Sequence, residues 1–213
     1  MQMDEKVLAI IDILKSRYPD PMCALHYQKD YELMIAVRLS AQCTDARVNM
    51  VTPALFAAYP TLEAMAAAPI EHIEQLVHSC GFYKHKARDI VLACQMLLSD
   101  YDGKVPGTME DLLKLPGVGR KTANLLLGDL YAVPGSVVCD THCIRICGRL
   151  GLSHGKEPEK VEVQLRAILP PEESSDFCHR IVLFGREVCT ARSPKCSECP
   201  LAMHCNEINK LDS

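Results

Sequence analysis

The chain has 213 residues, of which 48% are hydrophobic and 23% charged, which is the composition of a soluble globular protein of one or two domains. The N-terminal residues lack a basic segment, and no stretch approaches the roughly 20 apolar residues of a membrane span. We therefore expect a cytoplasmic protein without a signal peptide or transmembrane helix. The formal net charge is −4, so any binding of nucleic acid must depend on local basic patches.

Apolar residues recur at helical spacing along the first half of the chain. A helix is expected over 4–17, and residues 33–39 are apolar nearly all round, which is typical of a helix buried in the centre of a bundle. Asp45 can cap the helix that comes next. Further helices are expected from Thr61, from Pro69 to Gly81, and over 84–101.

The second half of the chain continues this pattern. Pro134-Gly135-Ser136 is a predicted turn and the most favourable position for a domain boundary. Beyond it, helices are expected over 141–150, 158–169 and 174–189. Because alternation with a period of two is almost absent, the predicted fold is all-α, with about ten short helices.

The segment after residue 107 predicts a helical hairpin. Thr108 with Asp111 can cap a first short helix, which Pro116-Gly117 ends. Gly117 and Gly119 allow a tight turn, and the second helix then carries a core stripe of Ala123, Leu126, Leu127 and Leu130. Backbone N–H groups in such a turn, at the start of a helix, suit a phosphate group.

Two simpler interpretations of this hairpin stay open. Gly117-x-Gly119 is half of a dinucleotide-binding loop, but Thr122 stands where that loop needs a third glycine or alanine, and a capped helix precedes it where a strand is required. A joint between two helices that binds nothing is a real competitor, because glycine and proline are common at such joints.

The 12 cysteines fall into two groups. Eight are scattered, and we expect them to be reduced thiols that act as small buried hydrophobes: Cys23, Cys43, Cys80, Cys94, Cys139, Cys143, Cys147 and Cys178. The others, Cys189, Cys196, Cys199 and Cys205, form the pattern C-x6-C-x2-C-x5-C, which predicts a metal centre. Four sulfur ligands suit zinc or an iron–sulfur cluster. The compact single run favours a [4Fe–4S] cluster, with zinc as the alternative.

Three features together resemble the endonuclease III family of helix-hairpin-helix DNA glycosylases with an iron–sulfur cluster. They are the hairpin with Lys121, the segment Val138-Cys139-Asp140-Thr141-His142, and the cysteine pattern. The segments Leu39-Ser40-Ala41-Gln42-Cys43-Thr44-Asp45 and Gly81-Phe82-Tyr83-Lys84-His85-Lys86-Ala87 also look like motifs of this family. The resemblance covers essentially the whole chain, with the motifs in the family's order.

The resemblance implies two α-helical domains, with DNA bound across the cleft between them. A six-helix barrel that contains the hairpin would cover residues 23–134, and a discontinuous iron–sulfur cluster domain would combine residues 1–22 with 135–213. Since the chain ends soon after Cys205, we expect it to lack the extra C-terminal domain of the related adenine-mismatch glycosylases.

The resemblance also implies the chemistry. Lys121 would attack C1′ of a nucleotide extruded from the duplex and form a Schiff base as the base leaves. Asp140 would take a proton or stabilise positive charge on the sugar, and β-elimination would then cut the strand. The simpler roles are a phosphate-binding lysine and an N-cap of the following helix.

Other residues are expected, as in the family, to contact DNA or support the site. Gln42 would fill the space left by the extruded nucleotide, and Phe82 would act as an apolar wedge where the family more often has leucine; a core hydrogen bond and a core aromatic ring are their simpler roles. Asp45 and His142 would support the site, His142 by orienting Asp140. The expected phosphate contacts are the hairpin glycines Gly117 and Gly119 and the side chains of Lys84, Lys86, Arg120, Arg145, Arg149 and Arg192.

The sequence thus predicts a bifunctional DNA glycosylase and abasic-site lyase of base excision repair that removes damaged, by expectation oxidised, pyrimidines. The expected partner is double-stranded DNA with damaged bases or abasic sites, the expected cofactor is a [4Fe–4S] cluster, and the protein is expected to be a monomer associated with the nucleoid. Two alternatives stay open. One is a monofunctional mismatch glycosylase, which leaves the backbone intact. The other is a non-catalytic DNA-binding module with a zinc clip.

Overall fold

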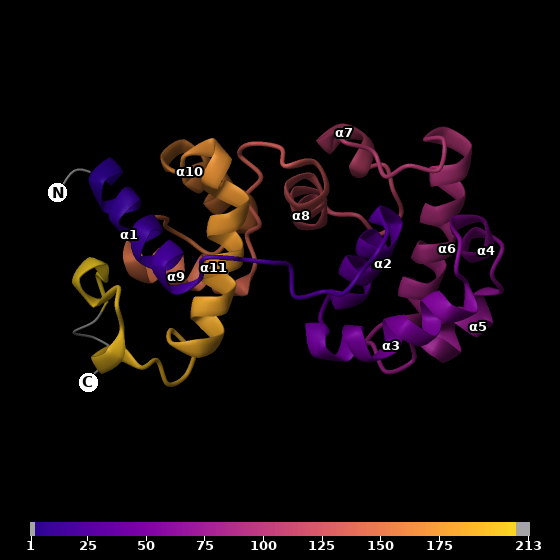
Figure 1. Cartoon of the computed structure of the whole chain (residues 1–213), viewed down its shortest axis with the longest axis horizontal. Coiled ribbons are helices and arrows are strands. Elements are labelled where there is room, and N and C mark those ends of the chain that lie inside the picture. The colour runs from indigo at the N-terminus through magenta and orange to yellow at the C-terminus, as the bar shows by residue number, and fades with distance from the viewer. Residues whose placement is uncertain (1–2, 208–213) are drawn as a thin grey trace. The chain divides into compact units, whose positions relative to one another are not determined.

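The computed structural model describes residues 3–207, and across this range it contains helices and no strand (Figure 1). The predicted all-α fold is therefore confirmed. The chain divides into two compact units. We call Cys23–Tyr131 the hairpin unit, and Met1–Met22 with Ala132–Ser213 the terminal unit.

The hairpin unit is built around one buried helix, as the apolar run over 33–39 predicted. This helix, α2, packs against α3, α6 and α8, and Leu33, Ile35 and Leu39 on it are fully buried. Figure 1 shows α2 between α8 and α6. The helices of the unit are α2 (Asp30–Ser40), α3 (Asp45–Ala58), α4 (Leu62–Ala66), α5 (Ile70–Leu76), α6 (Tyr83–Asp100), α7 (Met109–Leu112) and α8 (Arg120–Tyr131).

Threonine side chains cap three of these helices. Thr108 Oγ1 accepts from Asp111 N at 3.2 Å and donates to Asp111 Oδ2 at 2.7 Å, which confirms the predicted cap at the start of the helical hairpin. Thr61 caps α4 in the same way. The prediction that Asp45 caps α3 is wrong, because Thr44 is the N-cap and accepts from Arg47 N. Asp45 is the first helical residue, where the positive helix end favours its negative charge.

The terminal unit joins both ends of the described chain. Its helices are α1 (Met3–Arg17), α9 (Thr141–Leu150), α10 (Pro158–Ile168) and α11 (Ser174–Glu187), with short 3-10 helices η1 (Pro171–Glu173), η2 (Cys196–Glu198) and η3 (Ala202–His204). The buried Arg180 ties α11 to the end of α1, because its Nε donates to Tyr18 O at 3.1 Å and its Nη2 to Asp176 Oδ2 at 3.2 Å. The loop that carries Cys189, Cys196, Cys199 and Cys205 follows α11.

The scattered cysteines are reduced and mostly buried, as predicted. None of the 12 forms a disulfide, and six of the scattered eight are buried. Burial raises the pKa of Cys94 to about 12, so this thiol is protonated and inert at neutral pH. Among the described residues, no helix combines the length and the hydrophobicity that crossing a membrane requires.

Candidate functional site

The predicted hairpin lies between α7 and α8. Gly117 has φ +76°, a left-handed conformation that favours glycine, and Val118 N donates to Leu115 O at 3.1 Å to close the turn. A Cβ atom at Gly119 would have no heavy atom within 4 Å, so this exposed glycine leaves open space in front of the turn. The hairpin therefore offers backbone amides at a place where a phosphate group can approach closely.

Lys121 is exposed and lies in the first turn of α8, two residues after Gly119. Arg120 begins the helix and is half-buried. No negatively charged side chain occupies this first turn. An exposed amine thus lies next to the glycine turn on the hairpin unit.

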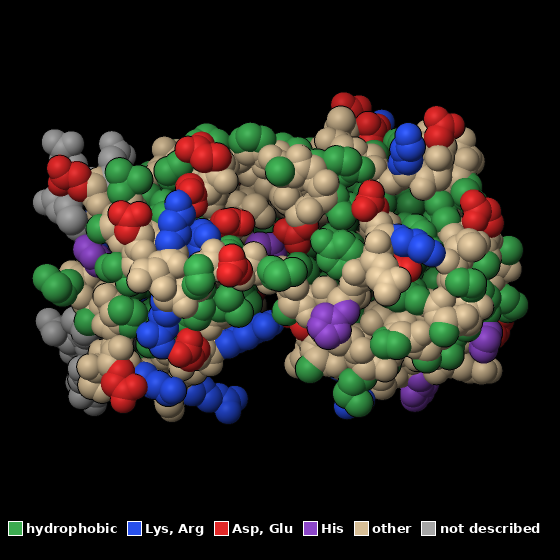
Figure 2. Space-filling view, in the orientation of Figure 1, with side chains coloured by type: hydrophobic (Ala, Val, Ile, Leu, Met, Phe, Trp, Pro, Cys, Tyr) green, Lys and Arg blue, Asp and Glu red, His purple; other side chains and the backbone are tan. Residues whose placement is uncertain are grey.

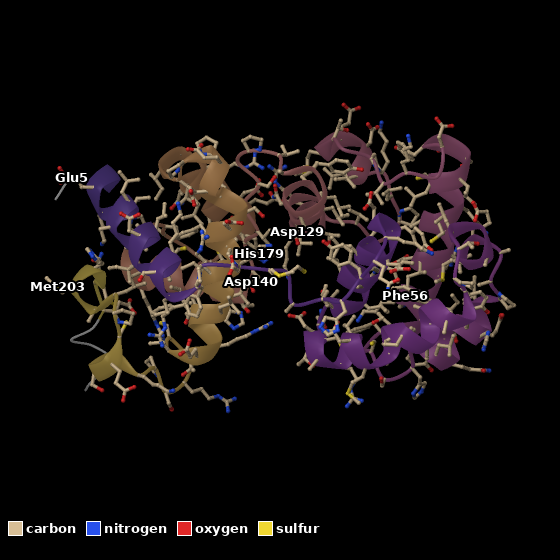
Figure 3. All side chains as sticks on the ribbon, viewed as in Figure 1. Glu5, Phe56, Asp129, Asp140, His179 and Met203 are labelled. Atoms are coloured by element: carbon tan, nitrogen blue, oxygen red, sulfur yellow. The ribbon has the colours of Figure 1, made fainter. Side chains whose placement is uncertain are left out.

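Asp140 is held rigidly at the start of α9 in the terminal unit (Figure 3). Its Oδ1 accepts from Cys143 N at 2.7 Å, and its Oδ2 lies 3.2 Å from His142 Nδ1. The simpler role of an N-cap is therefore real, and so is the predicted orienting contact with His142. One carboxylate makes both contacts, and it keeps 16% of its side chain exposed. An ionised carboxylate is favoured at this helix end.

Gln42 and Phe82 share an unusual backbone conformation. Both are left-handed, with φ +54° and +58°, and Phe82 is 64% exposed. We call Ala41–Cys43 and Cys80–Phe82 the probe turns. The two turns abut, because a Cβ atom at Gly81 would lie 3.7 Å from Gln42 O. They border a pocket of about 260 Å³, which is lined by Arg38, Ala41, Gln42, Phe82, His85 and Lys86.

The prediction that Lys86 contacts phosphate is wrong, because the side chain is only 1% exposed. Its Nζ donates to Leu39 O at 2.8 Å and to Ala41 O at 2.7 Å. These carbonyls belong to the end of α2 and the first probe turn. Burial lowers the pKa of the Lys86 ammonium below its ordinary value. Lys86 therefore caps α2 from inside the unit and holds the turn that carries Gln42.

The other predicted phosphate contacts differ in exposure. Lys84 and Arg192 are exposed, whereas Arg145 is half-buried and donates through Nη2 to Cys189 O at 3.0 Å. The guanidinium group of Arg145 is thus already hydrogen-bonded to the start of the loop after α11. In the terminal unit, Lys and Arg side chains gather near the end of α11 and the loop that follows it (Figure 2). This local patch is the kind of feature that an acidic chain needs for binding a polyanion.

The four C-terminal cysteines line one small cavity. Arg149 lies on the same wall, and its Nη1 donates to Cys189 Sγ at 3.1 Å. This contact ties α9 to the first cysteine of the loop. Among the described residues, no group of three or more His, Cys, Asp or Glu side chains is arranged to hold a single metal ion. Four thiols around a common cavity fit a [4Fe–4S] cluster, which uses one cysteine for each iron.

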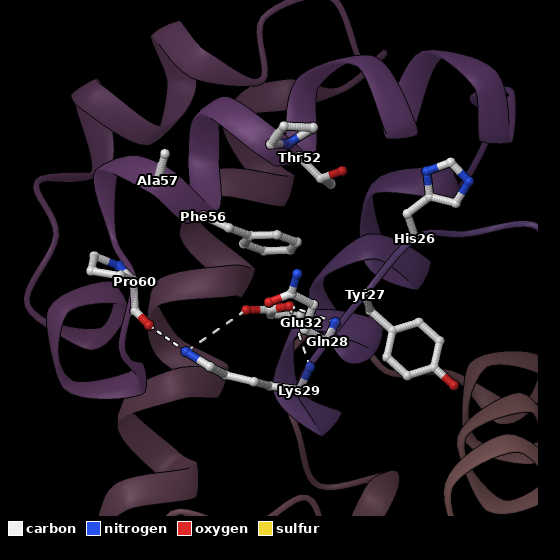
Figure 4. A pocket seen from close by; sticks show the side chains of 10 residues that line it. His26, Tyr27, Gln28, Lys29, Glu32, Thr52, Phe56, Ala57 and Pro60 are labelled. Carbon is white, nitrogen blue, oxygen red and sulfur yellow. Dashed lines mark hydrogen bonds and ion pairs between the residues drawn. The ribbon is translucent and has the colours of Figure 1, made fainter.

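A second pocket in the hairpin unit involves none of the predicted site residues. It has a volume of about 460 Å³ and is lined by residues of α2, of α3, of the segment before α2 and by Pro60 (Figure 4). Its charged groups are engaged within the chain. Lys29 Nζ donates to Pro60 O at 2.5 Å, and Glu32 Oε2 accepts from Gln28 N at 2.8 Å. We therefore assign it no part in the candidate site.

Two polar contacts at the site escaped prediction from sequence. Arg38 on α2 binds Asp89 on α6, and Arg149 on α9 binds Cys189. In the sequence, each arginine belongs to a segment that is recognisable only by its helical apolar stripe. The partner of each arginine is distant in the sequence. Only the position of Arg149, in the last turn of a predicted helix, indicated a cation close to the end of that helix.

Comparisons with known proteins agree with this geometry. Residues 35–171 match the HhH-GPD superfamily of base excision DNA repair proteins, and residues 189–205 match the iron-sulfur binding domain of endonuclease III. The second match contains all four cysteines that line the cavity. The cofactor of this loop is therefore an iron–sulfur cluster.

Relatives cover almost the whole chain. Endonuclease III of Synechocystis is 45% identical over 94% of this chain and 92% of its own length, and that of Bacillus subtilis is 42% identical over 95% and 92%. A solved structure of a trapped endonuclease III–DNA covalent intermediate, an estranged-adenine complex, has a TM-score of 0.93 and 42% identity over the full length of both chains. A thermostable thymine-DNA glycosylase, at 20% identity and a TM-score of 0.84, shares the fold.

We predict that Lys86→Met destabilises the protein, although methionine keeps most of the apolar stem. The substitution removes the donor from the buried Leu39 carbonyl group, at a cost of about 1–3 kcal/mol, and from the partly buried Ala41 carbonyl group, at a smaller cost. Lys84→Met, on the exposed side of the same helix, is the matched control and should leave stability unchanged. Thermal unfolding of both variants measures the difference. Unchanged stability of Lys86→Met, with weakened DNA binding, would restore the original prediction of a phosphate contact.

We also predict that Arg149→Gln weakens retention of the cluster. A hydrogen bond to a charged group contributes about 1.5–3 kcal/mol, so the cluster should decay roughly tenfold faster in air. Visible absorption and iron content follow the loss. Arg192→Gln, at an exposed position in the cysteine loop, is the control and should decay at the parent rate. Equal decay of all three proteins would show that the contact between Arg149 and Cys189 does not protect the cluster.

Proposed function

The chain belongs to the endonuclease III family within the HhH-GPD superfamily of base excision DNA repair proteins, and we propose that Lys121 and Asp140 carry its chemistry. The protein is a bifunctional DNA glycosylase and abasic-site lyase. The observation that carries the assignment of the nucleophile is the position of Lys121, exposed in the first turn of the helix that leaves the hairpin.

Lys121 forms the covalent bond in this proposal. The neutral amine attacks C1′ of the extruded nucleotide, the N–C bond forms, and the glycosidic bond breaks with its electron pair on the departing base. The proton that the nitrogen loses passes to Asp140 or to water. A covalent endonuclease III–DNA intermediate is described for a protein of the same fold at 42% identity, which supports such a bond here.

The lyase step follows from the Schiff base, which forms when the C1′–O4′ bond breaks with its electron pair on O4′ and the nitrogen lone pair closes the C1′–N double bond. The protonated imine acidifies C2′, a base removes that proton, and the C3′–O bond breaks so that the 3′ phosphate leaves with the electron pair. Water then hydrolyses the imine and regenerates the lysine. Asp140 suits the charge that develops on the sugar, because two contacts fix its carboxylate and leave part of it exposed.

The substrate in this proposal is duplex DNA with a damaged, in particular oxidised, pyrimidine or an abasic site. Gly117 and Gly119 offer backbone amides to a phosphate, and Lys84, Arg120 and Arg192 add cationic contacts. Phe82 enters the base stack and Gln42 fills the space of the extruded nucleotide. The protein acts as a monomer on chromosomal DNA in the cytoplasm. A monofunctional reaction is disfavoured, because Lys121 supplies the amine that such an enzyme does without.

We predict that Lys121→Gln abolishes covalent trapping by borohydride on an abasic-site duplex, because glutamine cannot form an imine. Asp140→Asn should still trap, but about 10²- to 10⁴-fold more slowly, since the carboxylate acts on proton transfer and charge. Gel analysis of the trapped adduct measures both rates. Lys114→Gln, exposed on the approach to the hairpin, is the control and should trap normally. A full yield of adduct from Lys121→Gln would refute the assigned nucleophile.

We predict that Phe82→Leu keeps most of the activity whereas Phe82→Ala loses it through DNA affinity. A base-stacking side chain contributes about 1–3 kcal/mol by alanine substitution, so Kd for an abasic-site duplex should rise by roughly 5- to 150-fold in the alanine variant. Because the ring is 64% exposed, thermal stability should not change in either variant. Fluorescence anisotropy measures Kd. Equal affinity of the alanine variant and the parent would exclude a wedge.

A further inference from the structure

A charged pair lies directly beneath the hairpin. Arg38, near the end of α2, donates through Nε to Asp89 Oδ2 at 2.8 Å, and its Nη2 lies 2.6 Å from the same oxygen. The two side chains are only 19% and 25% exposed, so water screens the pair weakly. The pair joins α2 to α6, two helices that are 51 positions apart at these residues.

The hairpin rests on this pair through Gly117. A Cβ atom at Gly117 would lie 2.8 Å from Asp89 Oδ2 and closer still to the guanidinium group of Arg38. Glycine is therefore favoured at position 117 for two reasons. Its φ is +76°, and two side chains that hold each other in place lie where a Cβ atom would be. With a side chain at this position, either the hairpin or the Arg38–Asp89 pair has to shift.

Arg38 also reaches the probe turns. Its side chain lines the pocket that Gln42 and Phe82 border, and Asp89 lies on the helix that begins directly after Phe82. One ion pair thus contacts the hairpin and stands beside both left-handed turns. The positions of all three turns relative to one another depend on how α2, α6 and the hairpin meet at this point.

We propose that Arg38 and Asp89 are positioning residues, which set the height and tilt of the hairpin and thereby the place of Lys121. This inference deepens the proposed function and rests on it. Lys121 lies four residues after Gly117, so a shift of the hairpin moves the amine with it. Misplacement of a reacting group by about 1 Å can cost on the order of 10²-fold in rate. The pair itself touches neither the sugar nor the base in this assignment.

The first experiment replaces the charges and keeps the bulk. Arg38→Met and Asp89→Asn are compared with the parent by single-turnover borohydride trapping on an abasic-site duplex, with enzyme in excess. We expect the trapping rate at saturation to fall about tenfold and the half-saturating concentration to rise, because the amine and the phosphate contact both shift. Arg38→Lys keeps a charge without the fork and should recover part of the rate.

The control pair separates positioning from general stability. Lys114 binds Asp111 at 2.9 Å on the approach to the hairpin, and its contact is solvent-exposed. Lys114→Met should leave the trapping rate and half-saturation unchanged. If Arg38→Met loses thermal stability but traps at the parent rate at a temperature where it is folded, the pair is structural only and the proposal fails.

The second experiment tests the contact with Gly117 directly. Gly117→Ala should reduce trapping at least 10²-fold in the parent, and markedly less, by about tenfold, in an Arg38→Ala background, because the space that Cβ needs is then open. The left-handed backbone is common to both backgrounds and cancels in the comparison. Additive losses would overturn the proposal even if a single variant folds poorly.

The lysine mechanism and the positioning role of Arg38 and Asp89 are refuted by different results. A parent protein that gives no covalent adduct refutes the lysine mechanism, whatever Arg38 does. A parent that traps normally, together with Arg38→Met and Asp89→Asn that trap equally well, leaves the function intact and refutes the positioning role. Trapping that is normal in the parent, reduced in both variants and partly recovered in Arg38→Lys supports both.

Discussion

The first amides of an α-helix have no acceptor within the helix, and this chain places its proposed chemistry at such helix starts. Asp140 accepts from the amide of Cys143 at the start of α9, and Lys121 follows the exposed amides of the hairpin at the start of α8. Phe82 lies immediately before α6. In an all-helical unit the apolar faces of the helices are buried in the core. Polar groups at the helix ends can therefore contact a ligand without disturbing the packing.

Two strained turns depend on the same packing. A left-handed backbone costs about 1–2 kcal/mol for a residue with a side chain, and Gln42 and Phe82 both adopt it. Such strain persists only where the surroundings determine the conformation. Here the ammonium group of Lys86 holds the carbonyl groups of Leu39 and Ala41, and Gly81 lies against Gln42 O. The exposed side chains of the probe turns are thus presented by a backbone that the interior fixes.

The sequence was sufficient for the local features and insufficient for the long-range polar contacts. The Thr108 cap, the buried helix around Leu33 and the hairpin glycines follow from spacing and residue type within a few positions. Asp45 failed as a cap because Thr44, one residue earlier, has the same capacity, and spacing cannot rank two adjacent capping residues. Lys86 failed because a lysine on a helix is exposed by default, and its burial is decided by carbonyl groups more than 40 positions away.

The ion pair between Arg38 and Asp89 was not predicted for the same reason. Each lies at the polar edge of a helical stripe, and nothing in either segment distinguishes a buried ion pair from two solvated charges. The resemblance to the family does not reveal the ion pair either, because a resemblance identifies motifs and not the residues that pack against them. The site residues were accessible to sequence reasoning because they sit in motifs. The residues that hold those motifs in place became visible only when α2, α6 and the hairpin were assembled.

The acidic net charge can be reconciled with DNA binding through the distribution of the cations. Several of them are committed to the protein itself: Lys86 to the end of α2, Arg145 and Arg149 to the loop after α11, and Arg180 to the end of α1. Fewer cations therefore remain for phosphates, and non-specific attraction, which grows with each phosphate neutralised, is correspondingly limited. In the proposed mode of binding, contacts that carry no net charge, from hairpin amides and the Phe82 ring, then supply a larger share of the binding energy. Insertion of the ring requires DNA whose base stack can open. Under this proposal, the scarcity of free charge therefore favours damaged over intact duplex.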